Sequence, residues 1–192
     1  TRLEIAWTIA PAIVLAVIAV PTIITLIDIA EDPSEDAVQV RVIGHQWWWE
    51  FQYPELNVIT ANELHLPVGK PVSLTLQSGD VIHSFWIPKL AGKVDMIPNV
   101  SNKLSFTPKE EGYFFGQCAE LCGVAHAQMR FRAIVQPVAD FQAWVQAQQA
   151  PATSGSVAGA TVFGVKGCGV CHTISGPDPE GLQKSRMEGF LQ

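Results

Sequence analysis

Charged side chains are absent from the first part of this sequence, between Ile5 and Ile27. About 23 uncharged, mostly apolar residues would measure roughly 34 Å as a helix, enough to cross the hydrocarbon core of a bilayer. The segment has no basic start and no small-residue cleavage site, and it exceeds the core of a signal peptide in length. A buried helix of a globular core is the alternative, but the run is too long and uniform for it. We therefore expect a transmembrane helix within residues 1–32. Because the chain starts abruptly at Thr1, we also expect a further span upstream.

Basic residues are scarce as well. The chain has 12 Lys and Arg against 18 Asp and Glu, which gives a formal charge of −6. This balance argues against nucleic acid as a partner and suits a basic protein.

Cysteine is also rare, and its placement argues against a framework of disulfides, its usual role in extracellular domains. The four cysteines form two local pairs, Cys118 with Cys122 and Cys168 with Cys171. A disulfide framework normally joins distant segments, so two local pairs favour attachment of cofactors.

Helical periodicity is missing from the region between residues 37 and 137. It consists of short alternating or aromatic-rich runs with Gly and Pro turns, which predicts a β-sandwich or barrel of about 100 residues. The expected strands lie within 38–44, 45–53, 63–88, 102–108, 112–117 and 129–136. In a strand at 45–53, Trp47 and Trp49 would face one side and Trp48 the other. A helix is expected at 138–149, followed by a linker of small residues at 150–160.

The stretch GQCAELCGVAHAQM holds the most informative spacing in the chain. Cys118, Cys122, His126 and Met129 form a soft ligand set that suits copper, whereas zinc has little use for a thioether. His83 follows an expected strand and is the best further candidate. A mononuclear blue-copper site needs one cysteine, so the second is surplus. Two cysteines on one loop can instead bridge two copper ions.

Four segments, GHQWWWE, HSFWIP, KVDMIP and the cysteine-containing loop, resemble the CuA domain of subunit II of haem–copper oxidases. The resemblance covers roughly residues 3–150 and implies a cupredoxin-like sandwich behind the membrane helix. It also implies a dinuclear copper centre. The implied ligands are the side chains of His83, Cys118, Cys122, His126 and Met129 and the main-chain carbonyl of Glu120.

The same resemblance implies roles for residues around the centre. Trp47 matches the family's tryptophan through which electrons enter. Packing in the core is the simpler role for the run from Trp47 to Trp49. The side chain of Glu120 matches a ligand of a magnesium ion shared with subunit I, and oxygen ligands suit such a cation. A solvated loop acid is the alternative for Glu120. Glu4 matches the mouth of a proton path, with a simple acid at the membrane border as the alternative. Asp95 resembles a residue at the family's interface with subunit I. The family often continues from there with Pro-Gly-Arg, which this chain lacks after Pro98.

The C-terminal part contains the spacing C-x2-C-H at Cys168, Cys171 and His172. This motif attaches haem c through two thioethers, with the histidine as an axial ligand. A redox or metal-binding C-x2-C is the alternative. Residues 161–192 therefore resemble the start of the cytochrome c domain fused to caa-type oxidases. They are too short for a complete domain, and Met187 is too close to serve as the distal ligand.

The function implied is that of an electron-accepting subunit of a terminal oxidase, which reduces oxygen in subunit I while protons are pumped. Cytochrome c, including the fused haem segment, is the expected donor. The bacterial inner membrane is the expected location, with the copper domain on the periplasmic side. A membrane-anchored copper carrier is the alternative from another class. A nitrous-oxide-reducing enzyme would need a large catalytic domain, and quinol oxidases lack these copper ligands.

Overall fold

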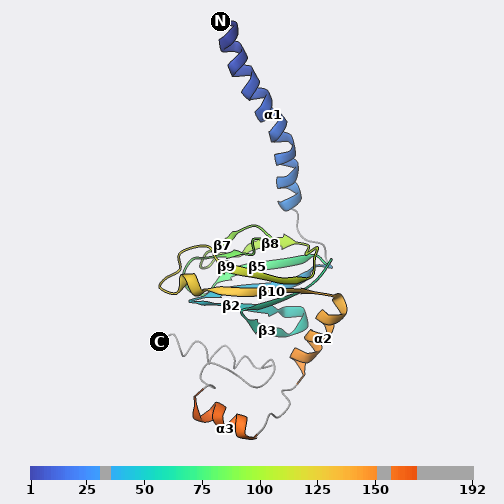
Figure 1. Ribbon diagram of the computed structural model, residues 1–192, viewed down its shortest axis with the longest axis vertical. Helices are drawn as coiled ribbons and strands as arrows, with labels where there is room; N and C mark the ends of the chain where they lie inside the picture. The colour runs from blue at the N-terminus through green and yellow to red at the C-terminus, as the bar shows by residue number, and fades with distance from the viewer. Residues whose placement is uncertain (31–35, 151–156, 168–192) are drawn as a thin grey trace. The chain divides into compact units, whose positions relative to one another are not determined.

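The computed structural model describes residues 1–30, 36–150 and 157–167. It divides into two units, Thr1–Glu35 and Asp36–Gln192 (Figure 1). The first unit contains the helix α1 (Arg2–Ala30). Its stretch Arg2–Ile27 has a mean hydropathy of 2.5, so α1 is long and apolar enough to cross a membrane, as predicted.

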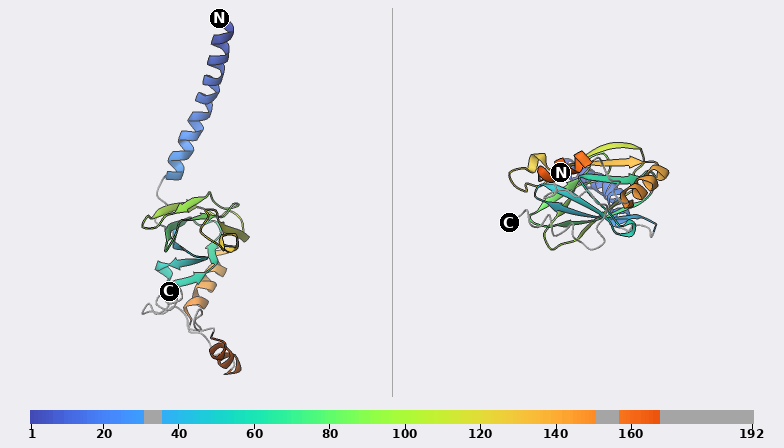
Figure 2. Two further views of the ribbon diagram at one scale, coloured as in Figure 1. Left: turned by 90° about the vertical axis from the view of Figure 1, so that its left-hand side faces the viewer. Right: turned by 90° about the horizontal axis from the view of Figure 1, so that it is seen from below.

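The second unit contains the predicted sandwich (Figures 1 and 2). Its described residues form two five-stranded sheets, in the orders β3-β2-β1-β5-β8 and β4-β10-β9-β6-β7. The first sheet consists of β1 (Val38–His45), β2 (Trp48–Tyr53), β3 (Val58–Ala61), β5 (Val72–Ser78) and β8 (Asn102–Phe106). The second consists of β4 (Glu63–Pro67), β6 (His83–Trp86), β7 (Val94–Met96), β9 (Gly112–Cys118) and β10 (Arg130–Gln136).

Most neighbouring strands are antiparallel, but β1 pairs with β5 and β4 with β10 in parallel. The alternating residues of β1 explain its place, because Val40, Val42 and Gly44 turn inward while Arg41 faces solvent. The strands β3 and β7 were not predicted. Short 3-10 turns occur at η1 (Pro54–Leu56) and η2 (His126–Gln128).

An aromatic cluster fills the core between the sheets. Trp49 from the first sheet lies 5.5 Å from Phe85 and 5.2 Å from Phe131, both in the second sheet. Phe85 and Phe131 stack with ring centroids 4.9 Å apart. All three side chains are at most 2% exposed, so they fix the spacing of the sheets with large buried apolar areas.

The prediction for residues 138–149 is confirmed by helix α2 (Val138–Gln149). Phe141 and Val145 are buried, and the indole of Trp144 stacks on the imidazole of His65 with centroids 4.1 Å apart. The Gln149 side chain donates a hydrogen bond to the carbonyl of Leu56. The helix is therefore packed onto the sandwich along its length.

Two expectations need correction. The tryptophan run is not a continuous strand, because Gln46 and Trp47 form the turn between β1 and β2. Trp47 is thus free of the strand's alternation, and it is partly exposed while Trp49 is buried. The range expected as linker is partly helical, since α3 (Val157–Val165) begins inside it.

Candidate metal centre

The predicted ligand loop joins β9 to β10 and is closed by main-chain hydrogen bonds. Cys118 ends β9, and its N–H donates to the carbonyl of Met129, just before β10. The N–H of the next residue, Ala119, donates to the carbonyl of Ser84 in β6. This bond holds the loop against the strand that begins with His83, so the distant histidine meets the loop.

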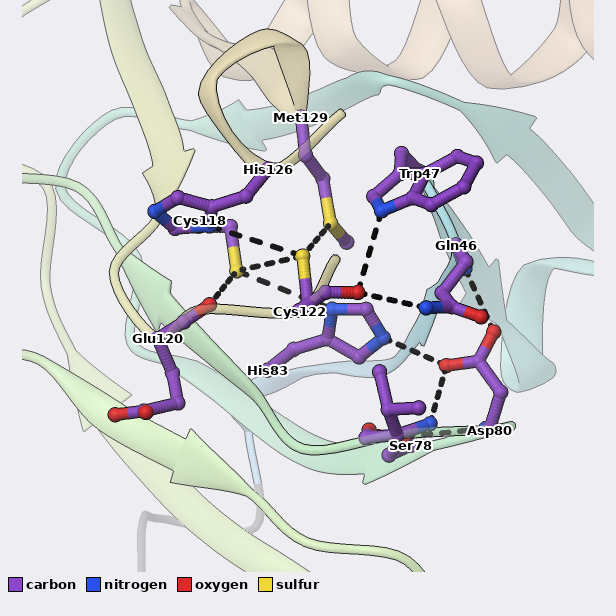
Figure 3. A network of polar contacts seen from close by, with 11 residues as sticks. Gln46, Trp47, Ser78, Asp80, His83, Cys118, Glu120, Cys122, His126 and Met129 are labelled. Atoms are coloured by element: carbon purple, nitrogen blue, oxygen red, sulfur yellow. Dashed lines mark hydrogen bonds and ion pairs between the residues drawn. The ribbon is translucent and has the colours of Figure 1, made fainter. Parts of the chain in front are cut away.

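Five predicted ligand side chains converge there (Figure 3). The sulfur atoms of Cys118 and Cys122 lie 3.8 Å apart. Each has its own imidazole neighbour: His83 Nδ1 is 3.9 Å from Cys118 Sγ, and His126 Nδ1 is 3.7 Å from Cys122 Sγ. Met129 Sδ lies 3.6 Å from Cys122 Sγ.

The arrangement fits a soft metal centre. The donor atoms of His83, Cys118 and Cys122 all lie within 4.8 Å of one another, and the three residues are buried. The Sγ–Sγ separation of 3.8 Å is far longer than a disulfide bond, which is about 2.05 Å. Two thiols with one imidazole beside each match a pair of metal ions better than one ion. The carbonyl of Glu120, 3.2 Å from Cys118 Sγ, supplies a further oxygen.

The two thiols differ in acidity. Burial alone would raise the pKa of Cys118, but hydrogen bonds with His83 and with the main chain of Glu120 outweigh it and lower that pKa. Burial raises the pKa of Cys122, and the charge on Cys118 adds to this effect. Burial also opposes protonation of His83, but contacts with Cys118 and Asp80 raise its pKa. The shifts therefore favour a thiolate on Cys118 rather than on Cys122, beside an imidazole whose pKa is raised.

Asp80 orients His83 from the side away from the sulfurs. Its Oδ1 lies 2.7 Å from His83 Nε2 and also accepts a hydrogen bond from the N–H of Val81. Because a hydrogen bond at one ring nitrogen fixes the orientation of an imidazole, Asp80 aims Nδ1 at the cysteines. This role of Asp80 was not predicted from the sequence.

Trp47 lies against the same loop. Its indole N–H donates to the carbonyl of Cys122 at 3.2 Å, and the side chain is 36% exposed. Buried core packing, the simpler role for this tryptophan, is therefore wrong for Trp47 but holds for Trp49. Trp47 is an aromatic side chain that reaches both solvent and Cys122, a predicted ligand residue.

The remaining predicted residues lie apart from this cluster or outside the described structure. The carboxylate of Glu120 is exposed and points away from the sulfurs (Figure 3). The main-chain carbonyl of Glu120, in contrast, lies beside Cys118 Sγ. Asp95 is exposed on β7, and Glu4 is exposed in α1. Cys168, Cys171, His172 and Met187 are outside the described residues.

Residues 57–137 match the family model of the periplasmic domain of cytochrome c oxidase subunit II. Cytochrome c oxidase subunit 2 of Apis mellifera ligustica is 36% identical over 168 residues, which cover 77% of this chain and 73% of the bee protein. The chain belongs to the cytochrome c oxidase subunit 2 family. The subunit 2 of Alkalihalophilus pseudofirmus is 38% identical over 185 residues and 92% of this chain.

This subunit 2 chain spans 54% of the length of the Alkalihalophilus protein and 56% of that from Bacillus sp. strain PS3. A crystal structure of the periplasmic domain of subunit II from Bradyrhizobium japonicum shares the fold. Its TM-score is 0.57 at 30% identity, over 59% of this chain and 94% of that one. The cupredoxin-like fold and family expected from the sequence are therefore confirmed.

Proposed function

We propose that this chain is the electron-accepting subunit of a haem–copper terminal oxidase. The observation that carries the proposal is the cysteine pair, with Sγ atoms 3.8 Å apart and a different histidine beside each sulfur. The proposed ligands of a dinuclear copper centre are the side chains of His83, Cys118, Cys122, His126 and Met129 with the carbonyl of Glu120. When bound, such a copper pair accepts and releases one electron at a time.

The chain's own residues suit this role. His83 and Met129 are fully buried, and both cysteines are at most 5% exposed, so the protein shields the donors from water. A ligand set held by packing and hydrogen bonds on all sides changes little in geometry, which favours electron transfer over binding of a substrate. Trp47 is the proposed site where electrons enter, since it joins solvent to the main chain of Cys122.

The proposed acceptor of these electrons is subunit I, where oxygen is reduced to water and protons are pumped. The exposed carboxylate of Glu120 is proposed to bind a magnesium ion shared with that subunit, since Mg²⁺ favours carboxylate oxygens. Glu4 is proposed as the mouth of a proton path. We place α1 in a bacterial inner membrane and the copper domain on its periplasmic side, with Asp95 facing subunit I.

The C-terminal segment is proposed to carry haem c on Cys168 and Cys171, with His172 as axial ligand. A donor fused to the chain would have a high effective concentration near the copper domain, so its docking need not limit the rate. Cytochrome c or another small redox protein would supply the electrons.

A crossed pair of cysteine variants tests both cofactors in the full chain. Cys118→Ser should abolish the near-infrared mixed-valence band and the second copper ion, while haem bound covalently, measured as the pyridine haemochrome of denatured protein, is retained. Cys171→Ser should leave two copper ions and weaken covalent haem attachment. A wild-type chain with one labile copper and no mixed-valence band would instead indicate a copper carrier. A wild-type chain without covalent haem would contradict the haem c proposal alone.

A further inference from the structure

The main-chain carbonyl of Cys122 accepts two hydrogen bonds from the turn between β1 and β2. Gln46 Nε2 donates at 2.7 Å, and Trp47 Nε1 donates at 3.2 Å (Figure 3). The carboxamide bond is the shorter and falls within the usual range for N–H···O bonds. Two neighbouring side chains from the β1–β2 turn of the first sheet thus hold one peptide group in the β9–β10 loop of the second sheet.

Gln46 also reaches the other side of the centre through its main chain. Its N–H donates to Asp80 Oδ2 at 2.6 Å, and Asp80 Oδ1 lies 2.7 Å from His83 Nε2. A continuous set of hydrogen bonds therefore runs from the carbonyl of Cys122 through Gln46 and Asp80 to His83. These two ligand residues are 39 positions apart in the sequence (122 − 83 = 39).

The loop is shaped to admit these donors. Gly123, the residue after Cys122, has φ +125°, a conformation that side chains disfavour. A Cβ at this position would lie 3.0 Å from Gln46 Nε2 and 3.1 Å from Trp47 Nε1. The glycine both allows the turn of the peptide and leaves space for the two donors.

We propose that Gln46 is a positioning residue for the metal centre, which fixes the peptide of Cys122 and, through Asp80, the ring of His83. The effect of Gln46 on electron transfer rests on the proposed copper function. The hydrogen bonds that join Gln46 to Cys122 and Asp80, here called the clamp, are present in the polypeptide without copper. Gln46 does not touch the donor atoms. It sets the orientation of the peptide from which Cys122 extends, because a carbonyl held by two donors has little freedom to rotate.

The side chain and the main chain of Gln46 can be separated by substitution. Gln46→Met keeps the unbranched shape and removes the Nε2 donor, while the main-chain bond to Asp80 stays. Gln46→Glu also keeps the shape, but a carboxylate accepts hydrogen bonds and repels the carbonyl of Cys122. Gln39→Met is the matched control, since Gln39 is partly buried in β1, the strand that leads into the turn at Gln46, and donates to the carbonyl of Ala37, away from the centre.

The first measurement uses the full chain without copper, so that it is independent of the proposed function. Hydrogen exchange of the amides between residues 119 and 125 should accelerate about five-fold in Gln46→Met, the factor expected for the loss of one net hydrogen bond. Gln46→Glu should give at least the same increase, and Gln39→Met should match the wild type. Unchanged exchange of this loop in both Gln46 variants would overturn the proposal.

The second measurement uses the full chain loaded with copper. The Gln46 variants should keep two copper ions per chain, yet show a shifted midpoint potential and altered copper hyperfine splittings, whereas Gln39→Met should show neither change. If the midpoint potential and the copper hyperfine splittings of the Gln46 variants equal those of the wild type, Gln46 does not position the centre. If the wild-type chain binds no copper pair, the proposed function fails, while the exchange measurement still decides whether the clamp exists. Circular dichroism identifies a variant that fails to fold, and the other Gln46 variant then supplies the test.

Discussion

Gly44 lies so close to His83 that a Cβ added to the glycine would come within 2.9 Å of the imidazole Cδ2. Gly44 belongs to β1 in one sheet, and His83 begins β6 in the other. The ring of His83 is fully buried, and its Nε2 is held by Asp80 Oδ1 at 2.7 Å. It therefore cannot give way without opening the core, and the missing side chain at position 44 is a requirement of the site.

Gly44→Ala should displace the His83 ring. We expect destabilisation of roughly 1–3 kcal/mol, typical of an overpacked core, and a reduced copper content per chain. Thermal unfolding and copper analysis of purified protein measure the two effects. Gly92→Ala is the matched control, since a Cβ at that glycine would meet no atom within 4 Å. Equal copper binding by both variants would show that the ring has room to move.

Trp47→Phe should slow electron uptake without removing copper. The variant keeps an aromatic ring but loses the hydrogen bond to the carbonyl of Cys122. We expect a decrease of about ten-fold or more, equivalent to about 1.4 kcal/mol in barrier height. Stopped-flow reduction of copper by a reduced donor measures this rate. Trp48→Phe should have little effect, because Trp48 stacks on His45 instead. Unchanged kinetics in Trp47→Phe would contradict the assigned role.

Glu120→Gln should separate two proposed roles of one residue. The main-chain carbonyl near Cys118 stays, so the copper pair should be retained. The exposed carboxylate is lost, so binding of a divalent ion at the interface with subunit I should weaken. Manganese substituted for magnesium in the assembled oxidase reports this binding by electron paramagnetic resonance. Loss of the copper spectrum, with the manganese signal intact, would reverse the assignment.

His65 should make stability sensitive to pH. Burial lowers the pKa of His65 below its ordinary 6.5, although Gln136 and Glu63 oppose the shift. The unfolded chain therefore binds this proton at a higher pH than the folded chain does. The stability linked to the neutral, buried His65 is fully present above about pH 6.5 and is lost as the pH falls towards the pKa of His65 in the folded chain.

His65→Phe keeps a ring against Trp144 and removes the titration. The melting temperature of the copper-free chain should then fall less between about pH 7 and pH 5.5 than in the wild type. Glu63→Gln removes a carboxylate 3.9 Å from His65 Nε2, so the melting temperature of this variant should fall more steeply with decreasing pH than that of the wild type. If the pH dependence of His65→Phe equals that of the wild type, the histidine does not control this transition.

The ligand loop was predictable because its chemistry is local. Cys118, Cys122, His126 and Met129 fall within twelve consecutive positions (129 − 118 + 1 = 12), and their spacing alone indicates a soft metal. Most of the strands and α2 were predictable from periodicity for the same reason, whereas the short strands β3 and β7 were not. His83 needed only the expectation that a sandwich brings its strands together.

The residues that hold the ligands could not be found in this way. Gln46, Asp80 and Gly44 act through contacts across the two sheets, and those contacts depend on the pairing of β1 with β5 and of β6 with β9. The turn at Trp47 was missed because an aromatic run of high strand propensity continues through it. Propensity describes each residue's preference, whereas the break in the strand is set by Asp80 and Cys122 elsewhere in the chain.

The ligands all project from one sheet and its β9–β10 loop, while Trp47 and Gln46 come from the turn of the other sheet. The proposed electron-entry surface and the proposed metal site are thus built from different parts of the sequence. In the proposed function, changes around Trp47 that leave the hydrogen bonds of Gln46 intact would adapt the protein to a new redox partner while every proposed ligand stays in place. This arrangement requires that the two sheets keep their relative position, since a small shift of one sheet would separate Gln46 and Trp47 from Cys122.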